Sequence, residues 1–133
     1  MKKVTIIDYG MGNLYSVQNA LKAVGAEPVV TSDAAVIAQA ERILLPGVGA
    51  FGDCMENLHK SGLIPVIMES LHSGKPFLGI CLGMQVLFEG SDEAPGVRGL
   101  GFFKGQVKYL PTQLKVPHMG WNKLELRSPS PLL

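Results

Sequence analysis

"PFLGICLGMQ", residues 76–85, is the stretch of this sequence that predicts most about its fold. The apolar run from Phe77 to Ile80 predicts a buried strand, and residues 82–88 predict a helix that begins at once. Cys81 falls on the turn between them, with one glycine two residues before it and another two residues after it. A core cysteine needs no such glycines. The stretch therefore raises the question of whether this thiol is presented for reaction.

The rest of the chain repeats the alternation of strand and helix. Short apolar runs predict strands at residues 4–7, 28–31 and 42–45, and three-to-four spacing of apolar residues predicts helices at 14–24 and 34–40. Residues 52–71 predict two helical pieces, because Gly62 and Pro65 interrupt the pattern. Short strands without a polar face indicate an α/β fold, with a mostly parallel sheet covered by helices on both faces. After residue 96 we expect an antiparallel section, since 101–110 and 121–126 resemble strands without an intervening helix.

Composition limits the classes of function. With 133 residues, 47% of them hydrophobic, we expect a single domain over residues 1–127 and an unstructured or aberrant tail at 128–133, where two prolines interrupt a short apolar end. A net charge of +1 without a basic cluster argues against nucleic acid as a partner. No apolar stretch suits a signal peptide or a membrane span, so we expect a cytoplasmic protein without a membrane partner. The two cysteines fit no zinc spacing, and we expect neither a metal nor a cofactor.

The pattern G-x-C-x-G at Gly79 to Gly83 is the cysteine version of a nucleophile elbow, a sharp strand-to-helix turn. A Cβ at either glycine would collide across so tight a turn. An elbow nucleophile also needs backbone N–H donors for a developing oxyanion, and the first would be the N–H of Leu82. The glycine-rich loop at residues 46–49, "PGVG", is a natural second source, although an ordinary turn after a strand explains it equally well. Cys54 lies within a helical pattern and is interpreted as structural.

Another glycine-bearing corner, Gly10 and Gly12, follows the first predicted strand. It lacks the third glycine of a dinucleotide-binding loop. Asp8 beside it would also repel a pyrophosphate. The sequence therefore does not predict nucleotide binding at this corner.

Three segments, "LLPGVGAFG" (44–52), "GICLGMQ" (79–85) and "PHMGWN" (117–122), together resemble the class I glutamine amidotransferases. Within that family they are most similar to the glutaminase subunits of imidazole glycerol phosphate synthases of histidine biosynthesis. The resemblance runs from Val4 to about Glu125. It implies a flavodoxin-like core and hydrolysis of glutamine through a thioester at Cys81, which releases ammonia.

The resemblance also implies roles for other residues. Gly47 and Val48 match the oxyanion peptide, and Gln85, with Gly49 and Gly83, matches the positions around the bound glutamine. In the family, ammonia passes to a cyclase subunit with a β/α barrel, which forms a heterodimer with the glutaminase. The residues that match the face turned to this partner are Asn13, His118, Trp121 and Asn122. For Trp121, a place in the hydrophobic core is an equally good reading of the sequence alone.

The family pattern breaks at the catalytic base. Family members supply a histidine and a glutamate two residues apart in a late H-P-E segment, and this sequence contains none. For His59, His72 and His118 an exposed or locally satisfied side chain is favoured over a catalytic one. We therefore expect the chain to resemble the amino-terminal two-thirds of the enzyme, with little glutaminase activity and marginal stability.

Two other interpretations stay open at this point. A non-catalytic module that docks on the cyclase through the Trp121 face would also explain the absent base. A cysteine hydrolase of the peptidase or chaperone kind would use the same elbow, but it would not explain residues 117–122.

Overall fold

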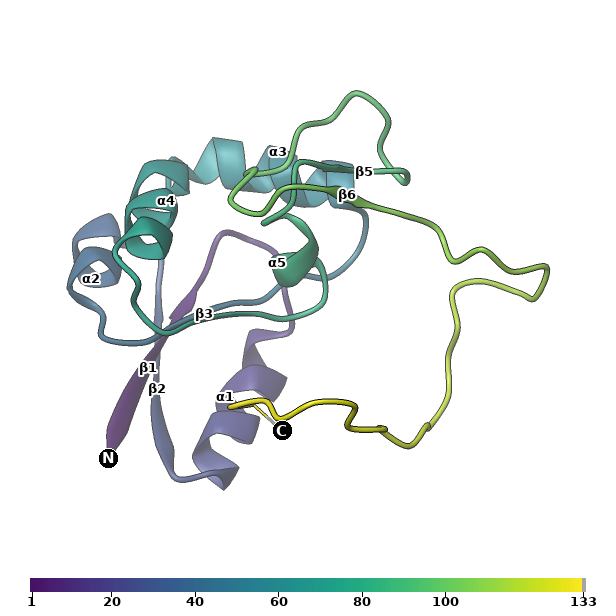
Figure 1. Cartoon of the computed structure of the whole chain (residues 1–133). Coiled ribbons are helices and arrows are strands. Elements are labelled where there is room, and N and C mark those ends of the chain that lie inside the picture. Colours follow the sequence, from purple (N-terminus) through teal and green to yellow (C-terminus); the bar gives the residue numbers. More distant parts are fainter. Residues whose placement is uncertain (133) are drawn as a thin grey trace.

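The computed structural model describes residues 1–132 and has the alternation that the sequence predicts (Figure 1). Most elements lie in the first 85 residues, and the chain beyond them is largely loop. The elements in chain order are β1 (Lys2–Ile7), α1 (Leu14–Ala23), β2 (Ala26–Thr31), α2 (Ala34–Gln39), β3 (Ile43–Leu45), α3 (Phe51–Ser61), α4 (Ile64–His72), β4 (Phe77–Gly79), α5 (Leu82–Gln85), β5 (Gly90–Ser91) and β6 (Gln106–Val107).

Four parallel strands form the main sheet in the order β2-β1-β3-β4. The α/β class with a parallel sheet is therefore confirmed. Helix α1 lies on the opposite side of the strands from α2, α3 and α4, as Figure 1 shows. All four carboxyl ends meet at one edge of the sheet, which is where ligands bind in folds of this kind.

The hydrophobic core lies between the sheet and helices α2 to α5. Strand residues alternate between the two faces, so Ile7, Ile43 and Leu45 belong to this core. On the other face, Ile6 and Leu44 are buried, whereas their neighbour in register on β4, Leu78, is 46% exposed. Strand β4 is thus an edge strand with an open apolar side chain.

Local signals place the ends of α1, α3 and α4 close to where the sequence predicts them. Helix α1 begins after Asn13, whose side-chain oxygen accepts a hydrogen bond from the N–H of Ser16 at 3.1 Å. Gly25, with φ of 75°, follows the helix. Gly62, with φ of 70°, ends α3, and Pro65 lies in the first turn of α4, so residues 51–72 form two helices.

The expected antiparallel section after residue 96 is wrong for the described residues. Strands β5 and β6 pair in parallel, and the one antiparallel contact in residues 1–132 is a bridge between Gly90 and Arg98. Gly101 and Gly105 have φ of 66° and 118°, which turns the backbone away from an extended path. Residues 121–126 are exposed and pair with no strand in this part of the chain.

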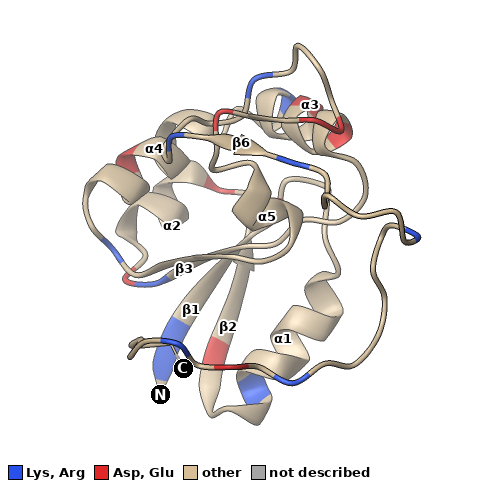
Figure 2. Cartoon of the chain, turned by 45° about the vertical axis from the view of Figure 1, so that its right-hand side comes forward, with Lys and Arg blue, Asp and Glu red and all other residues tan. Residues whose placement is uncertain are grey.

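Beyond β6 the chain swings outward and returns towards α1 (Figures 1 and 2). Residues 128–132 contain no helix or strand, and Leu133 lies outside the described residues. The domain boundary at residue 127 stays a prediction. Basic and acidic residues are interspersed over the elements, for example Lys3 on β1 beside Glu27 on β2 (Figure 2).

Candidate functional site

Cys81 occupies a strained turn between β4 and α5. Its φ and ψ are 56° and −119°, and within residues 1–132 it is the one non-glycine residue with positive φ. The N–H of Gly83 donates to the carbonyl oxygen of Ile80 at 2.9 Å, which closes a four-residue turn. These dihedrals are those of the second residue of a type II′ turn, a position dominated by glycine. A cysteine held there stores strain, and such strain is concentrated at functional sites.

The two glycines of the motif are required by close packing. A Cβ on Gly79 would lie 2.6 Å from the carbonyl oxygen of Gly83, and one on Gly83 would lie 1.9 Å from the carbonyl oxygen of Leu45. Both partners are backbone atoms, which cannot move aside as a flexible side chain does. The reason given from the sequence, a collision across the turn, is thus confirmed for Gly79, whereas Gly83 is required by its contact with the end of β3.

The loop at residues 46–49 lies directly against the elbow. A Cβ on Gly47 would be 2.6 Å from the nitrogen of Gly83 and 2.9 Å from the Cβ of Leu82. Pro46 and Gly47 are buried, whereas Val48 is about half exposed. The structure therefore brings Gly47 together with Leu82 and Gly83, although they are far apart in the sequence.

Several backbone donors near the elbow are free. No hydrogen bond within residues 1–132 uses the N–H of Gly47, Val48, Gly49 or Leu82 as donor. Gly49 has φ of 89°, so the loop turns sharply after Val48. Free N–H groups on two adjoining segments are what an oxyanion hole requires.

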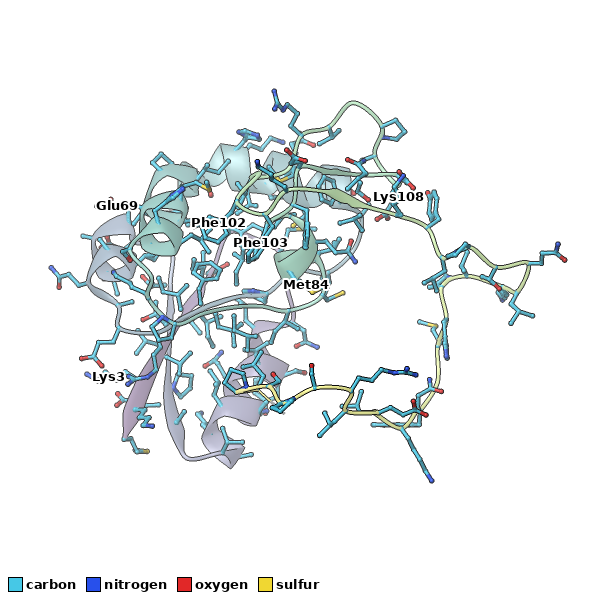
Figure 3. All side chains as sticks on the ribbon, viewed as in Figure 1. Lys3, Glu69, Met84, Phe102, Phe103 and Lys108 are labelled. Carbon is cyan, nitrogen blue, oxygen red and sulfur yellow. The ribbon has the colours of Figure 1, made fainter. Side chains whose placement is uncertain are left out.

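The residues after Cys81 form a single short turn of helix. Gln85 donates its N–H to the carbonyl oxygen of Cys81 at 3.1 Å, and its side chain is partly buried. Met84, labelled beside α5 in Figure 3, is 47% exposed. Helix α5 ends at Gln85, earlier than the predicted Phe88, because turns and the Gly90 bridge follow. Cys81 itself is exposed.

No histidine is bound to the cysteine in the described part of the chain, since the Cys81 sulfur makes no hydrogen bond there. His72 caps its own helix, with Nδ1 2.7 Å from the carbonyl oxygen of Met68. The Nε2 atom of His118 lies 3.0 Å from the side-chain nitrogen of Asn122, and His59 is exposed on α3. As expected, all three are exposed or locally satisfied.

Of the four residues predicted to face a partner, three lie in the loop segment after β6. Trp121 is fully exposed, so a place in the core is excluded for the described structure. His118 and Asn122 contact each other, while Asn13 caps α1. No hydrogen bond in residues 1–132 joins Asn13 to that segment.

Sequence reasoning missed Tyr9, which follows β1. Its hydroxyl donates to the carbonyl oxygen of Pro46 at 2.6 Å and lies 3.1 Å from the sulfur of Cys54. Burial raises the pKa of Tyr9 and also that of Cys54. Cys54 is completely buried, in agreement with its structural interpretation. The available signal was the position of Tyr9 at the carboxyl end of a central strand.

The larger hollows of the surface lie away from the elbow. One of about 580 Å³ is at the amino ends of the strands, near Lys3 and Arg42, and one of about 650 Å³ lies within residues 110–119. The described residues contain no group of three or more potential metal ligands. No helix among them has the length and apolar character needed to cross a membrane.

Comparison with known proteins identifies the family that has this elbow. The family model for class-I glutamine amidotransferase matches residues 5–128. The chain belongs to this family. The match includes the elbow at Cys81 and the loop at residues 46–49.

In curated relatives, about half of the residues aligned with this chain are identical to it. Imidazole glycerol phosphate synthase subunit HisH of Aquifex aeolicus (strain VF5) is 53% identical over 98% of the chain. The HisH subunit of Bacillus cereus (strain G9842) is 51% identical over 97% of it. The chain spans 64% and 62% of the lengths of these two relatives.

Solved structures share the fold at low identity. A crystal structure of a glutamine amidotransferase superposes with a TM-score of 0.66 and 19% identity, covering 79% of this chain and 55% of the other. A putative Peptidase E protein from Listeria monocytogenes EGD-e has a TM-score of 0.55 and 16% identity, covering 66% and 50%. These likenesses show the fold alone.

Proposed function

We propose that this chain is the glutaminase part of an imidazole glycerol phosphate synthase, with Cys81 as nucleophile. The observation that carries the proposal is the strained backbone of Cys81, held at φ of 56° between two glycines that tolerate no Cβ. The family, class-I glutamine amidotransferase, supports the choice of glutamine as substrate, and relatives named as subunits of that synthase support the choice of synthase.

The proposed chemistry is hydrolysis of glutamine to glutamate and ammonia in two steps. The Cys81 thiolate attacks the side-chain amide carbon, the oxyanion forms, and the C–N bond then breaks to leave a thioester. The departing nitrogen takes up a proton to leave as ammonia, and water then releases glutamate and restores the thiol. The N–H of Leu82 and the loop peptide at Gly47 and Val48 are proposed to hold the oxyanion. Gln85, Gly49 and Gly83 are proposed to border the bound glutamine.

Proton transfer limits this chemistry in the chain as described. General acid–base catalysis contributes roughly 10²–10⁴-fold to such reactions. Cys81 has no histidine partner within residues 1–132, so no side chain of this part of the chain is positioned to give ammonia its proton. We therefore propose that Cys81 is reactive towards glutamine analogues while turnover of glutamine itself is slow.

Labelling with a chloromethyl ketone analogue of glutamine tests the site. We expect modification of Cys81 and not of buried Cys54, and protection by glutamine. The matched reagent is the corresponding alanine chloromethyl ketone, which has the same warhead without the glutamine side chain. Equal labelling by both reagents, or no protection by glutamine, would sink the proposal.

The second candidate, a non-catalytic module that docks on a cyclase, is favoured by the full exposure of Trp121. Aromatic side chains are enriched at protein interfaces, and a fully exposed tryptophan is an unusual feature of a free surface. Titration with the cyclase subunit of a relative, followed through tryptophan fluorescence, tests it, since this chain has one tryptophan. Binding of the cyclase by a chain whose Cys81 is not labelled by the glutamine reagent would favour docking over catalysis.

A further inference from the structure

The loop at residues 46–49 has its first anchor in the sheet. The carbonyl oxygen of Leu45, the last residue of β3, accepts a hydrogen bond from the N–H of Ile80 at 3.0 Å. Gly47 packs against the elbow so closely that a Cβ would lie 2.6 Å from the nitrogen of Gly83. Small rotations of the loop therefore change the distance between its N–H groups and Cys81.

A second anchor holds the next carbonyl group. The hydroxyl of Tyr9 donates to the carbonyl oxygen of Pro46 at 2.6 Å. Because the Tyr9 proton is used in this bond, the 3.1 Å contact between Tyr9 and Cys54 is made with the thiol as donor. The three residues come from the end of β1, from α3 and from the end of β3, so the chain of bonds links three separate segments.

This chain of bonds lies out of water. Tyr9 is 5% exposed, Cys54 is completely buried and Pro46 is buried. A buried carbonyl group without a hydrogen-bond partner destabilises the folded protein. The bond from Tyr9 therefore holds the peptide between Pro46 and Gly47 in one orientation. The peptides that follow carry the free N–H groups of Val48 and Gly49.

We propose that Tyr9, with its hydroxyl supported by Cys54, is a positioning residue that holds the oxyanion loop in register with Cys81. This inference rests on the proposed attack of Cys81 on a glutamine carbonyl. Tyr9 touches neither the nucleophile nor the substrate in this scheme. It acts through the Pro46 carbonyl, whose orientation sets the direction of the next N–H groups.

The state of protonation agrees with this role. Burial raises the pKa of the Tyr9 hydroxyl and, as the largest influence, that of the Cys54 thiol. Both groups therefore keep their protons at neutral and mildly alkaline pH. The two donors that the chain of bonds requires are present throughout this range.

Two reagents separate positioning from general reactivity. With the glutamine chloromethyl ketone, the thiolate first adds to the carbonyl carbon, which forms an oxyanion, and the sulfur then displaces chloride at the neighbouring CH₂ group to leave a thioether. With iodoacetamide, the thiolate displaces iodide at a CH₂ group directly and no oxyanion forms. We measure the second-order rate of Cys81 modification by each reagent in wild type and Tyr9→Phe. Removal of one oxyanion donor typically costs about 10²–10³-fold, so for a misplaced donor we expect a loss of about tenfold. The rate with iodoacetamide should change less than about twofold.

Cys54 provides a second pair of variants, which is useful if Tyr9→Phe does not fold. Cys54→Ala removes the donor to Tyr9, whereas Cys54→Ser keeps one. Chloromethyl ketone labelling should fall more in Cys54→Ala than in Cys54→Ser, with near-equal iodoacetamide rates. Circular dichroism and thermal unfolding confirm that each variant is folded before labelling.

The outcomes distinguish this inference from the function on which it rests. If wild-type Cys81 reacts no faster with the glutamine chloromethyl ketone than with the alanine chloromethyl ketone, both the positioning role and the proposed function are overturned. Selective wild-type labelling that Tyr9→Phe leaves unchanged overturns the positioning role alone. A parallel fall with both reagents also overturns it, because the hydroxyl would then support the fold of the elbow and not the oxyanion loop.

Discussion

Replacement of Cys81 by glycine should stabilise the protein relative to replacement by alanine. Both variants lose the thiol, but only glycine adopts φ of 56° and ψ of −119° without strain. Strain of this kind costs roughly 1–3 kcal/mol, and the greater freedom of glycine in the unfolded chain offsets about 0.4–1 kcal/mol. We therefore expect Cys81→Gly to exceed Cys81→Ala by about 1 kcal/mol in the free energy of unfolding. For a chain of this size that corresponds to a rise in Tm of about 4 °C.

A matched pair at Ser73 tests the sign. Ser73 ends α4 with φ of −71°, an ordinary helical value. There Ser73→Ala should be more stable than Ser73→Gly by about 0.5–1 kcal/mol, because glycine has no strain to relieve. Thermal and urea unfolding of all four variants, under one buffer condition, measures both differences.

Equal stability of the two Cys81 variants would refute the reasoning. It would mean that the turn relaxes when the thiol is removed, so that the strained backbone is not imposed by its surroundings. The same order at Cys81 and Ser73 would refute it too. The expected reversal between the two positions would show that a nucleophile is held at a cost in stability.

Three further predictions follow from particular contacts. Gly83→Ala should destabilise the protein by at least about 2 kcal/mol, because its Cβ would meet the Leu45 carbonyl oxygen at 1.9 Å. The control Gly52→Ala, whose Cβ would lie 3.7 Å from Ala94, should have little effect. Urea unfolding compares the two variants, and similar losses of stability would count against the close approach. Stability should fall as pH rises above about 9. Cys54 and Tyr9, with ordinary pKa values of 9.0 and 10.0, ionise in the unfolded chain, while their raised pKa values keep them protonated in the folded chain. Each group lowers the free energy of unfolding by up to about 1.4 kcal/mol per pH unit, and an unchanged dependence of that free energy on pH in Tyr9→Phe would contradict this. Asn13→Ala should cost about 1 kcal/mol through loss of the α1 cap, whereas Asn13→Ser should keep most of that stability. Titration with a cyclase subunit measures partner binding by Asn13→Ser. A fall in binding without a fall in stability would indicate that Asn13 faces the partner as well.

The amino-acid sequence by itself determined the α/β class, the elbow and most helix ends, although not the early end of α5. These features depend on signals within a few residues, such as the apolar run before Cys81, the glycines beside it and the break at Gly62 and Pro65. Short apolar strands alternating with helices leave few arrangements other than a parallel sheet. The sequence also carried the family, through three motifs that lie far apart along the chain.

The tertiary structure alone decided which of these segments meet. It placed Gly47 against Leu82 and Gly83, and it joined Tyr9, Pro46 and Cys54 by hydrogen bonds, because β1 and β3 are neighbours and α3 packs behind them. It also overturned the antiparallel section, since a strand requires a partner and residues 121–126 find none in the described chain. Pairing and contact between distant segments depend on the packing of the whole sheet, and no local pattern of residues encodes them.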